Sequence, residues 1–395
     1  MPNAFSVTVA IGNKTWTVDS SNVPAQRNLG NVLERAYAIG RTNTTAIQST
    51  LQTPFRERTN RAVALRESGI NLTTTASYDH EAVRALVADI AAYVTRDPVD
   101  AQIQSFDYAT RTFSFTESQP GVTLDQDLLY ERVTAALDRW ESGVTVTVDP
   151  IVTEPAVTKD ELVASFGLVA AYTTETTNDS NRNTNIDLAC QAINGTALMP
   201  GETFSFNQAT GQRTTEKGYK SAGAIAAGQS IEEVGGGICQ VSSTLFNAVA
   251  RANLEIVSRS PHAWPSTYVN IGEDATVNWP NLDFQFKNNT KSPIFIITYY
   301  KNRRMSAEIW GMSLGEGVTI DLQSTIIKTI DPPSEVKYEL NTDLPYGTEK
   351  TTVKARTGYV VETEKVWYKD GQETSRELLH TSNYRAYQQV IEYNY

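Results

Sequence analysis

The segment EEVGGGICQVSSTLFNAVARAN, residues 232–253, places three consecutive glycines two residues ahead of a cysteine. The apolar residues that follow recur at helical spacing: Ile238, Val241, Leu245, Phe246 and Val249. Cys239 therefore falls in the first turn of a predicted helix over 238–253. Unpaired amides and the helix dipole at such a terminus favour an anion, which lowers the pKa of a thiol. The segment thus predicts a reactive thiolate.

A nucleophilic thiolate needs a base or an imidazolium beside it. Between residues 160 and 320 the chain has one histidine, His262, in the stretch SRSPHAWPSTY. The alternative is that Cys239 is a small buried hydrophobic residue and that His262 is structural. A phosphate-binding loop is excluded, because no Gly-Lys-Ser/Thr follows the glycines.

The composition narrows the function classes. The chain has 395 residues, enough for several domains, and a formal net charge of −11 from 34 Lys and Arg against 45 Asp and Glu. It has no basic run, so no nucleic acid partner is expected. Its two cysteines, Cys190 and Cys239, lack zinc-site spacing, and neither a metal nor an organic cofactor is expected. Cys190, in IDLACQAI, is predicted to lie in the core, although one disulfide between the two cysteines stays open.

The pattern of helices, strands and turns predicts a multidomain α+β protein. A β-hairpin is expected over 4–18 and helices over 27–39, 78–95 and 125–140, whereas the region after 337 has strand patterns only. The predicted divisions are an N-terminal α+β segment (4–77), a second α+β domain (78–155), a central α+β domain (163–315) and a β domain (325–393).

Within the central domain, several motifs appear in order: NGTALMPGETFSFNQATGQRTTEKGY, GGGICQVSSTLFNA, SRSPHAWPSTYV and IGEDATV. This region, about 165–315, resembles the VanW domain family. The resemblance implies an L,D-transpeptidase of peptidoglycan, with Cys239 as nucleophile and His262 as its partner.

The flanking regions resemble other cell-wall modules. Residues 78–155 contain DHEAVRALVADIAAYVTRDPVDAQI and then PGVTLDQDLLYERVTAALDRW. These stretches are similar to the peptidoglycan-binding domain that precedes transpeptidase domains in Gram-positive wall enzymes. Residues 325–393 resemble a G-five (G5) domain, a β module credited with binding wall sugars. Gly347, Gly358 and Gly371 match its pattern, whereas the final glycine is missing from QQVIEYNY.

The implied reaction begins with a tetrapeptide stem that ends in D-Ala. Cys239 would attack the carbonyl of the third residue, a diamino acid, and expel D-Ala, with His262 supplying the proton. Backbone amides around Gly236, Gly237 and Ile238 would hold the oxyanion. An amine from a second stem would then resolve the thioester and form a 3–3 cross-link.

Other residues are assigned with an alternative each. Asp274 is expected either to orient His262 or to be an acidic turn residue. Arg213 and Arg259 would bind the terminal carboxylate of the stem or form structural ion pairs. Tyr219 and Tyr268 would line the groove or belong to the core. Gln240 and Ser242 would serve the site or cap the helix.

Two other function classes remain open: a non-catalytic wall-binding protein, and a thiol carboxypeptidase or amidase that cuts stem peptides. In each case the partners are peptidoglycan stem peptides and glycan strands. The Thr-, Asn- and Tyr-rich, Cys-poor composition suits an extracellular, wall-facing protein. We expect a monomer with an N-terminal membrane anchor that is absent from this chain.

Overall fold

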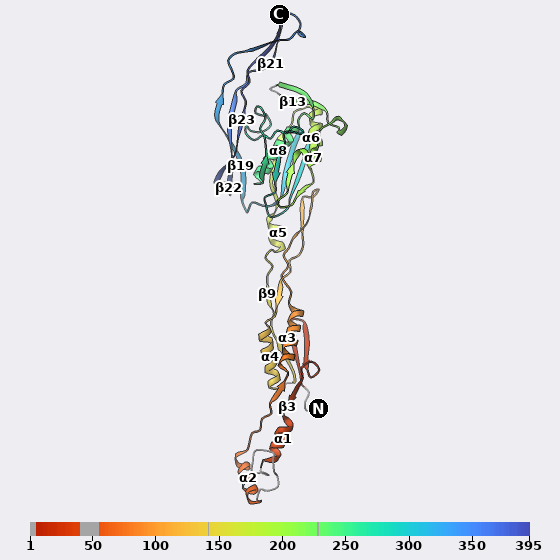
Figure 1. Ribbon diagram of the computed structural model, residues 1–395, viewed down its shortest axis with the longest axis vertical. Coiled ribbons are helices and arrows are strands. Elements are labelled where there is room, and N and C mark those ends of the chain that lie inside the picture. Colours follow the sequence, from red (N-terminus) through yellow and green to blue (C-terminus); the bar gives the residue numbers. More distant parts are fainter. Residues whose placement is uncertain (1–4, 40–54, 141, 227–228) are drawn as a thin grey trace. The chain divides into compact units, whose positions relative to one another are not determined.

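The computed structural model describes residues 5–39, 55–140, 142–226 and 229–395. The chain forms two compact units (Figure 1). The first comprises Met1–Gln102 with Glu117–Lys159, and the second comprises Ile103–Thr116 with Asp160–Tyr395.

The first unit is an α+β unit around a three-stranded sheet of order β2-β1-β8. Strand β1 pairs antiparallel with β2 and parallel with β8. The strands of this unit are β1 (Ser6–Ile11), β2 (Lys14–Asp19), β3 (Ala25–Arg27), β4 (Ala76–Tyr78), β7 (Gly121–Thr123), β8 (Ser142–Thr147) and β9 (Ile151–Thr153). The helices are α1 (Leu29–Ala38), α2 (Phe55–Ser68), α3 (His80–Val94) and α4 (Gln126–Asp138).

Local sequence signals explain these elements. Strand β1 alternates, with Val7, Val9 and Ile11 buried on one face. Helices α3 and α4 begin where the carboxylates of Asp79 and Asp125 accept hydrogen bonds from first-turn amides. A single core runs from Phe5 to Val148, so the two N-terminal segments that the sequence divides at 77/78 are packed together.

The second unit is built on a four-stranded antiparallel sheet of order β10-β18-β17-β11. Its strands are β10 (Phe166–Glu175), β11 (Thr196–Leu198), β17 (Ile294–Lys301) and β18 (Arg304–Met312). Helices α6 (Ser180–Ile193) and α8 (Ile238–Arg251) share its hydrophobic core, and α5 (Lys159–Ser165) precedes β10. A hairpin of β5 (Ile103–Asp107) and β6 (Thr112–Phe115) also packs here, with Phe106 against Phe295 and Trp310.

Smaller elements complete the part of the second unit before the C-terminal region. They are a sheet of order β12-β16-β15, the hairpin β13-β14, the short helix α7 (Phe206–Thr210) and the 3-10 helix η1 (Thr215–Lys217). The strand bounds are β12 (Thr203–Ser205), β13 (Ser221–Ala226), β14 (Gln229–Val234), β15 (Glu255–Ser258) and β16 (Gln285–Lys287).

The C-terminal region consists of strands only, as predicted, and is drawn in blue in Figure 1. One sheet has the order β19-β22-β23 and the other β20-β24-β21. Their bounds are β19 (Val318–Ile330), β20 (Lys337–Leu340), β21 (Thr348–Val353), β22 (Gly358–Lys369), β23 (Gln372–Tyr384) and β24 (Val390–Asn394). The first sheet packs against α8: Leu322 joins the core of that helix, and Asp321 pairs with Arg251 at 2.8 Å. The predicted multidomain α+β class with an all-β C-terminal module is confirmed.

Across the described parts of the chain, none of the helices has the length and apolar character needed to cross a bilayer.

Gly236, between β14 and α8, provides a test of this packing. A Cβ at this position would lie 2.7 Å from the carbonyl carbon of Ala222 and 2.8 Å from the carbonyl oxygen of Gly223. Both are backbone atoms, so no side-chain rotation can relieve the clash. We expect Gly236→Ala to destabilise the second unit by about 1–3 kcal/mol, the usual cost of overpacking, in thermal or denaturant unfolding. Gly167→Ala, in β10, is the matched control because its Cβ would meet no atom within 4 Å. Equal stability of the two variants would contradict this account.

Candidate active site

The glycine triplet sets the position of Cys239 at the start of α8. Gly237 is the N-cap, with a left-handed φ of 103°, and Gly235 also has a positive φ, of 90°. The helix begins at Ile238, so the partly exposed Cys239 lies in its first turn, as predicted. Its Sγ lies 3.5 Å from Thr276 Oγ1 and 3.4 Å from the carbonyl oxygen of Val277.

The amides near Cys239 differ in their availability. The Gly236 amide donates to the Glu233 carbonyl at 3.1 Å, and the Ile238 amide donates to the Gly235 carbonyl at 3.3 Å. Among the residues that the structure describes, the amides of Gly237 and Cys239 have no acceptor. These two are therefore the free donors for an oxyanion, whereas the expected donors Gly236 and Ile238 are used in the turn.

The His262 imidazole is fixed by Asp274. Its Nδ1 lies 2.5 Å from Asp274 Oδ2, and the same oxygen accepts a hydrogen bond from the His262 amide at 2.7 Å. The other ring nitrogen, Nε2, lies 3.4 Å from the Tyr268 hydroxyl. Bonding at Nδ1 fixes the ring orientation, which is the role of the carboxylate in a nucleophile–His–Asp triad.

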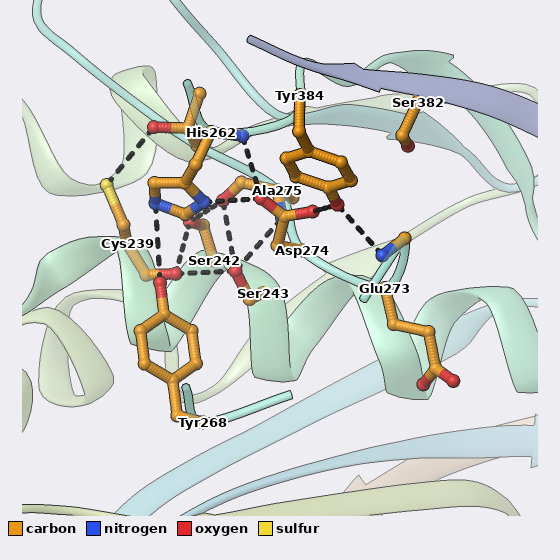
Figure 2. A network of polar contacts seen from close by, with 12 residues as sticks. Cys239, Ser242, Ser243, His262, Tyr268, Glu273, Asp274, Ala275, Ser382 and Tyr384 are labelled. Carbon is orange, nitrogen blue, oxygen red and sulfur yellow. Dashed lines mark hydrogen bonds and ion pairs between the residues drawn. The ribbon is translucent and has the colours of Figure 1, made fainter. Parts of the chain in front are cut away.

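Asp274 is itself held from its other side, as Figure 2 shows. Its Oδ1 accepts hydrogen bonds from Arg259 Nη2 at 3.0 Å and from the Tyr384 hydroxyl at 2.5 Å. The side chain is only 1% exposed. A buried carboxylate is tolerated only when it is paired and hydrogen-bonded, and this one is.

These contacts shift the pKa values of all three groups. Burial raises the pKa of the Cys239 thiol, but His262, Thr276 and Val277 outweigh it and lower the pKa to about 7. Burial lowers the pKa of His262, but Asp274 and Cys239 raise it to about 10. Burial raises the pKa of Asp274, but His262 and Arg259 lower it to about 2. The lowered pKa of the thiol and the raised pKa of the imidazole together favour a thiolate beside an imidazolium.

The site opens into a cavity of about 860 Å³. Its wall includes the glycine turn, Cys239, His262 and Tyr268. Two arginines, Arg182 and Arg213, also line it, as do residues of the C-terminal module such as Asn383 and Arg385. No group of three or more His, Cys, Asp or Glu side chains that would suit a metal ion lies within the described residues.

Three family models match the chain in order. "Putative peptidoglycan binding domain" covers residues 16–145, "VanW like protein" covers 181–310, and "G5 domain" covers 323–394. The uncharacterized protein YoaR of Bacillus subtilis is 32% identical over 299 residues, which are 75% of this chain and 94% of that protein. The chain belongs to the VanW-like protein family.

Two further proteins are similar to parts of this chain. The vancomycin B-type resistance protein VanW of Enterococcus faecalis is 33% identical over 115 residues, 28% of this chain and 42% of that protein. The G5 domain of an IgA1 protease is 23% identical, covering 20% of this chain and 92% of that domain with a TM-score of 0.14. The domain content makes the VanW-like protein a peptidoglycan-binding protein of the cell wall.

The structure gives several expected site residues a different environment. Gln240 and Ser242 are at most 1% exposed. Gln240 Nε2 donates to Thr174 Oγ1 and to the Glu175 carbonyl, both at 2.8 Å, and Ser242 Oγ donates to the Ala275 carbonyl at 2.6 Å. Gln240 nevertheless lines the cavity, whereas Ser242 does not, and neither side chain caps α8.

The guanidinium of Arg259 is also hydrogen-bonded within the protein. It donates to the Asp274 carboxylate, to the backbone oxygens of Asp274 and Gly272, and to Ser382 Oγ. Because Arg259 is held by these bonds and does not line the cavity, the structural ion pair is the one of its two expected roles that the structure contains. Tyr219 lies in the core at 4% exposure, whereas Tyr268 lines the cavity.

Two residues of the site were missed by sequence reasoning. Arg182, on α6, lies in the cavity wall next to the glycine turn. Tyr384, at the end of β23, reaches Asp274 from the C-terminal module. Neither has a local signal, because each is brought to the site by packing between segments far apart in sequence. Cys190, as predicted, is a core residue, and both cysteines are free.

The pKa shifts predict how the thiol responds to pH. Since the pKa of Cys239 is lowered to about 7, alkylation by iodoacetamide should rise with pH through a midpoint near 7, below the ~8.5 of an ordinary thiol. In His262→Ala the burial effect is no longer opposed by the imidazolium, so the midpoint should move to about 8.5 or above. The measurement is the rate of Cys239 alkylation as a function of pH, with mass spectrometry used to detect the alkylated protein.

Cys190→Ala is the matched control for this experiment. Cys190 is 1% exposed and burial raises the pKa of its thiol, so the variant should keep the wild-type midpoint. A wild-type midpoint at or above 8.5 would contradict the ion pair.

Proposed function

We propose that this VanW-like protein is a cysteine-dependent L,D-transpeptidase that cross-links peptidoglycan stem peptides outside the cell. The observation that carries the proposal is the thiol of Cys239 at a helix start, with its pKa lowered by an imidazole that Asp274 holds. The peptidoglycan-binding model at 16–145 supports a substrate in the cell wall.

In the first step, the Cys239 thiolate attacks the carbonyl carbon of the third stem residue. Negative charge develops on the carbonyl oxygen, and the free amides of Gly237 and Cys239 are the donors suited to hold it. The carbon–nitrogen bond to the fourth residue then breaks. The departing amine takes a proton from the His262 imidazolium, which leaves a thioester on Cys239 and a neutral imidazole.

In the second step, the side-chain amine of another stem attacks the thioester. His262, now neutral, accepts the proton of this amine, and the Cys239 thiolate leaves. The products are a 3–3 cross-link and an enzyme in its initial charge state. If water attacks instead, the same groups make the protein an L,D-carboxypeptidase.

A non-catalytic wall-binding protein is the second candidate. Its support is the domain content, in which a peptidoglycan-binding model and a G5 model flank the VanW-like region. Such a protein gains nothing from a thiol of lowered pKa in a cavity wall, which is why we favour the enzyme.

Intact-mass spectrometry of the full chain mixed with purified disaccharide-tetrapeptide tests the proposal. We expect the wild type to gain the mass of the disaccharide-tripeptide acyl group, to release D-Ala and to form cross-linked dimers. Cys239→Ala should do none of these, because no other described cysteine reaches the cavity.

Cys190→Ala, a change at a buried core cysteine, serves as the control and should retain the adduct. D-Ala release without dimers would indicate a carboxypeptidase. Neither an adduct nor turnover, with Cys239 inert to alkylation, would support the wall-binding candidate.

A further inference from the structure

Two arginines that form no ion pair among the described residues line the cavity beside Cys239. Arg213 follows α7, and its Nε, Nη1 and Nη2 atoms are buried without a hydrogen-bond partner among the described residues. The Nη1 atom of Arg182, on α6, is in the same condition. Burial lowers the pKa of both guanidinium groups.

Two other arginines near the site, neither of which lines the cavity, are paired. Arg259 binds Asp274 at 3.0 Å, and Arg251 binds Glu273 at 3.3 Å. In a chain with a net charge of −11, acidic partners are abundant, yet within the described residues none forms an ion pair with Arg182 or Arg213. The Arg213 guanidinium lies 5.6 Å from the centre of the Phe206 ring, but its N–H groups have no acceptor among the described residues. A buried cation without acceptors is costly, and an anionic ligand that supplies them removes the cost.

The glycine turn places both arginines close to the nucleophile. A Cβ on Gly237 would lie 2.6 Å from Arg182 Cγ, and a Cβ on Gly235 would lie 3.1 Å from Arg213 Cβ. The two side chains therefore pack against the same short turn that presents Cys239. The charge of each arginine is also felt at the Cys239 sulfur, which stabilises the charged forms of both.

We propose that Arg182 and Arg213 form a carboxylate-binding subsite for the free C-terminus of the residue that leaves. Guanidinium groups match a carboxylate through paired N–H donors. A carboxylate next to the scissile bond is the anion that would reach both Cys239 and these arginines. The inference rests on the proposed function and limits it: the substrate is a stem peptide with a free C-terminal carboxylate, and the bond cleaved is its last peptide bond.

A peptide series tests this subsite. On the tetrapeptide acid, Arg213→Gln should lower kcat/KM about tenfold to a hundredfold, the range for a hydrogen bond to a charged group, mainly through KM. On the C-terminal amide the wild type should lose a similar factor, whereas Arg213→Gln should lose little more. Arg182→Gln should behave alike. Arg304→Gln, at an exposed ion pair with Glu175, is the control and should leave both rates unchanged.

Two arms separate the possible failures. A tetrapeptide amidated on the side-chain carboxylate of its third residue tests that carboxylate, and a loss there instead of at the C-terminus would overturn the assignment. Calorimetric binding of the acid and amide peptides to Cys239→Ala requires no turnover. Preference for the acid without wild-type turnover would keep the subsite and reject the enzyme, whereas turnover with equal use of acid and amide would reject the subsite alone.

The C-terminal module points to a second, independent inference. The Tyr384 hydroxyl, at the end of β23, donates to Asp274 Oδ1 at 2.5 Å and accepts from the Gly272 amide at 2.8 Å. Ser382 Oγ accepts from Arg259 Nη1 at 2.7 Å, and His380 Nε2 lies 2.8 Å from the Gly272 carbonyl oxygen. Strand β23 thus contacts the Asp274 carboxylate, its partner Arg259 and Gly272 in the turn before it.

The C-terminal module also contacts the loop that carries His262 (residues 261–265, the histidine loop). The Arg385 amide donates to the Ala263 carbonyl at 3.0 Å, immediately after His262. Arg356 stacks over the Trp264 ring at 4.3 Å, and Tyr387 meets the same ring edge-on at 5.7 Å. We infer that β23 is part of the active site and that Tyr384 is a positioning residue, acting through Asp274 on the His262 imidazole.

Tyr384→Phe tests this role because it removes only the hydroxyl. We expect kcat for acylation to fall about tenfold with KM nearly unchanged, since Tyr384 touches Asp274 and does not line the cavity. A loosened His262 lowers the pKa of Cys239 less, so the midpoint of its alkylation profile should also rise. This second readout does not need the peptide substrate.

Tyr368→Phe is the matched control, because its hydroxyl accepts a hydrogen bond from Gln323 within the same sheet. It should leave kcat and the alkylation midpoint unchanged. If Tyr384→Phe lowers the unfolding temperature but changes neither kcat nor the midpoint, the tyrosine is structural and the inference fails.

Discussion

The buried carboxylate of Asp274 is the group on which the arrangement of the site depends. It accepts hydrogen bonds from the His262 amide and ring, from Arg259 and from Tyr384, and it is only 1% exposed. Without these donors, an ionised carboxylate at this depth would cost several kcal/mol. The donors come from the histidine loop and from the last long strand of the C-terminal module. One desolvated charge therefore links two parts of the second unit that are matched by separate family models.

Fully buried polar side chains of helix α8 hold the backbone on both sides of Asp274. Asn247 donates to the Glu273 carbonyl at 2.8 Å, and Ser242 donates to the Ala275 carbonyl at 2.6 Å. Ser243 Oγ accepts from the Ala275 amide at 2.9 Å. The backbone on both sides of Asp274 is thus tied to the helix that carries Cys239. Because all of these buried polar groups are satisfied, the network fixes the spacing of nucleophile, base and carboxylate.

Glycine is required at each of the three positions before Cys239, for different physical reasons. Gly235 and Gly237 adopt positive φ, and side chains there would also meet the two cavity arginines. Gly236 has no such backbone requirement, but it passes close to the backbone of Ala222 and Gly223, where any Cβ would clash. The triplet therefore forms a turn in the chain, leaves space for the side chains of Arg182 and Arg213, and leads directly into the first turn of α8.

Local patterns were sufficient for the elements whose stability is local. The alternation in β1 and the apolar periodicity over 78–95, over 125–140 and after Gly237 predicted a strand and three helices that the structure contains. Unpaired amides at a helix start pointed to Cys239 as a reactive thiol, and the one histidine of the region pointed to His262. The two N-terminal segments, divided at 77/78 by pattern, proved to share a core because β8 returns to pair with β1.

By itself, the sequence determined the α+β class, the all-strand C-terminal module and the placement of a cysteine at a glycine-capped helix start, because each depends on interactions between near neighbours. Only the tertiary structure decided which polar groups face the cavity and which face the protein. It directed the hydrogen bonds of Ser242 and Arg259 into the protein, left buried nitrogens of Arg182 and Arg213 without hydrogen-bond partners among the described residues, and brought Tyr384 to Asp274 across 110 positions of sequence. Burial and pairing of charge depend on which distant segments meet, and no local pattern in the chain records that.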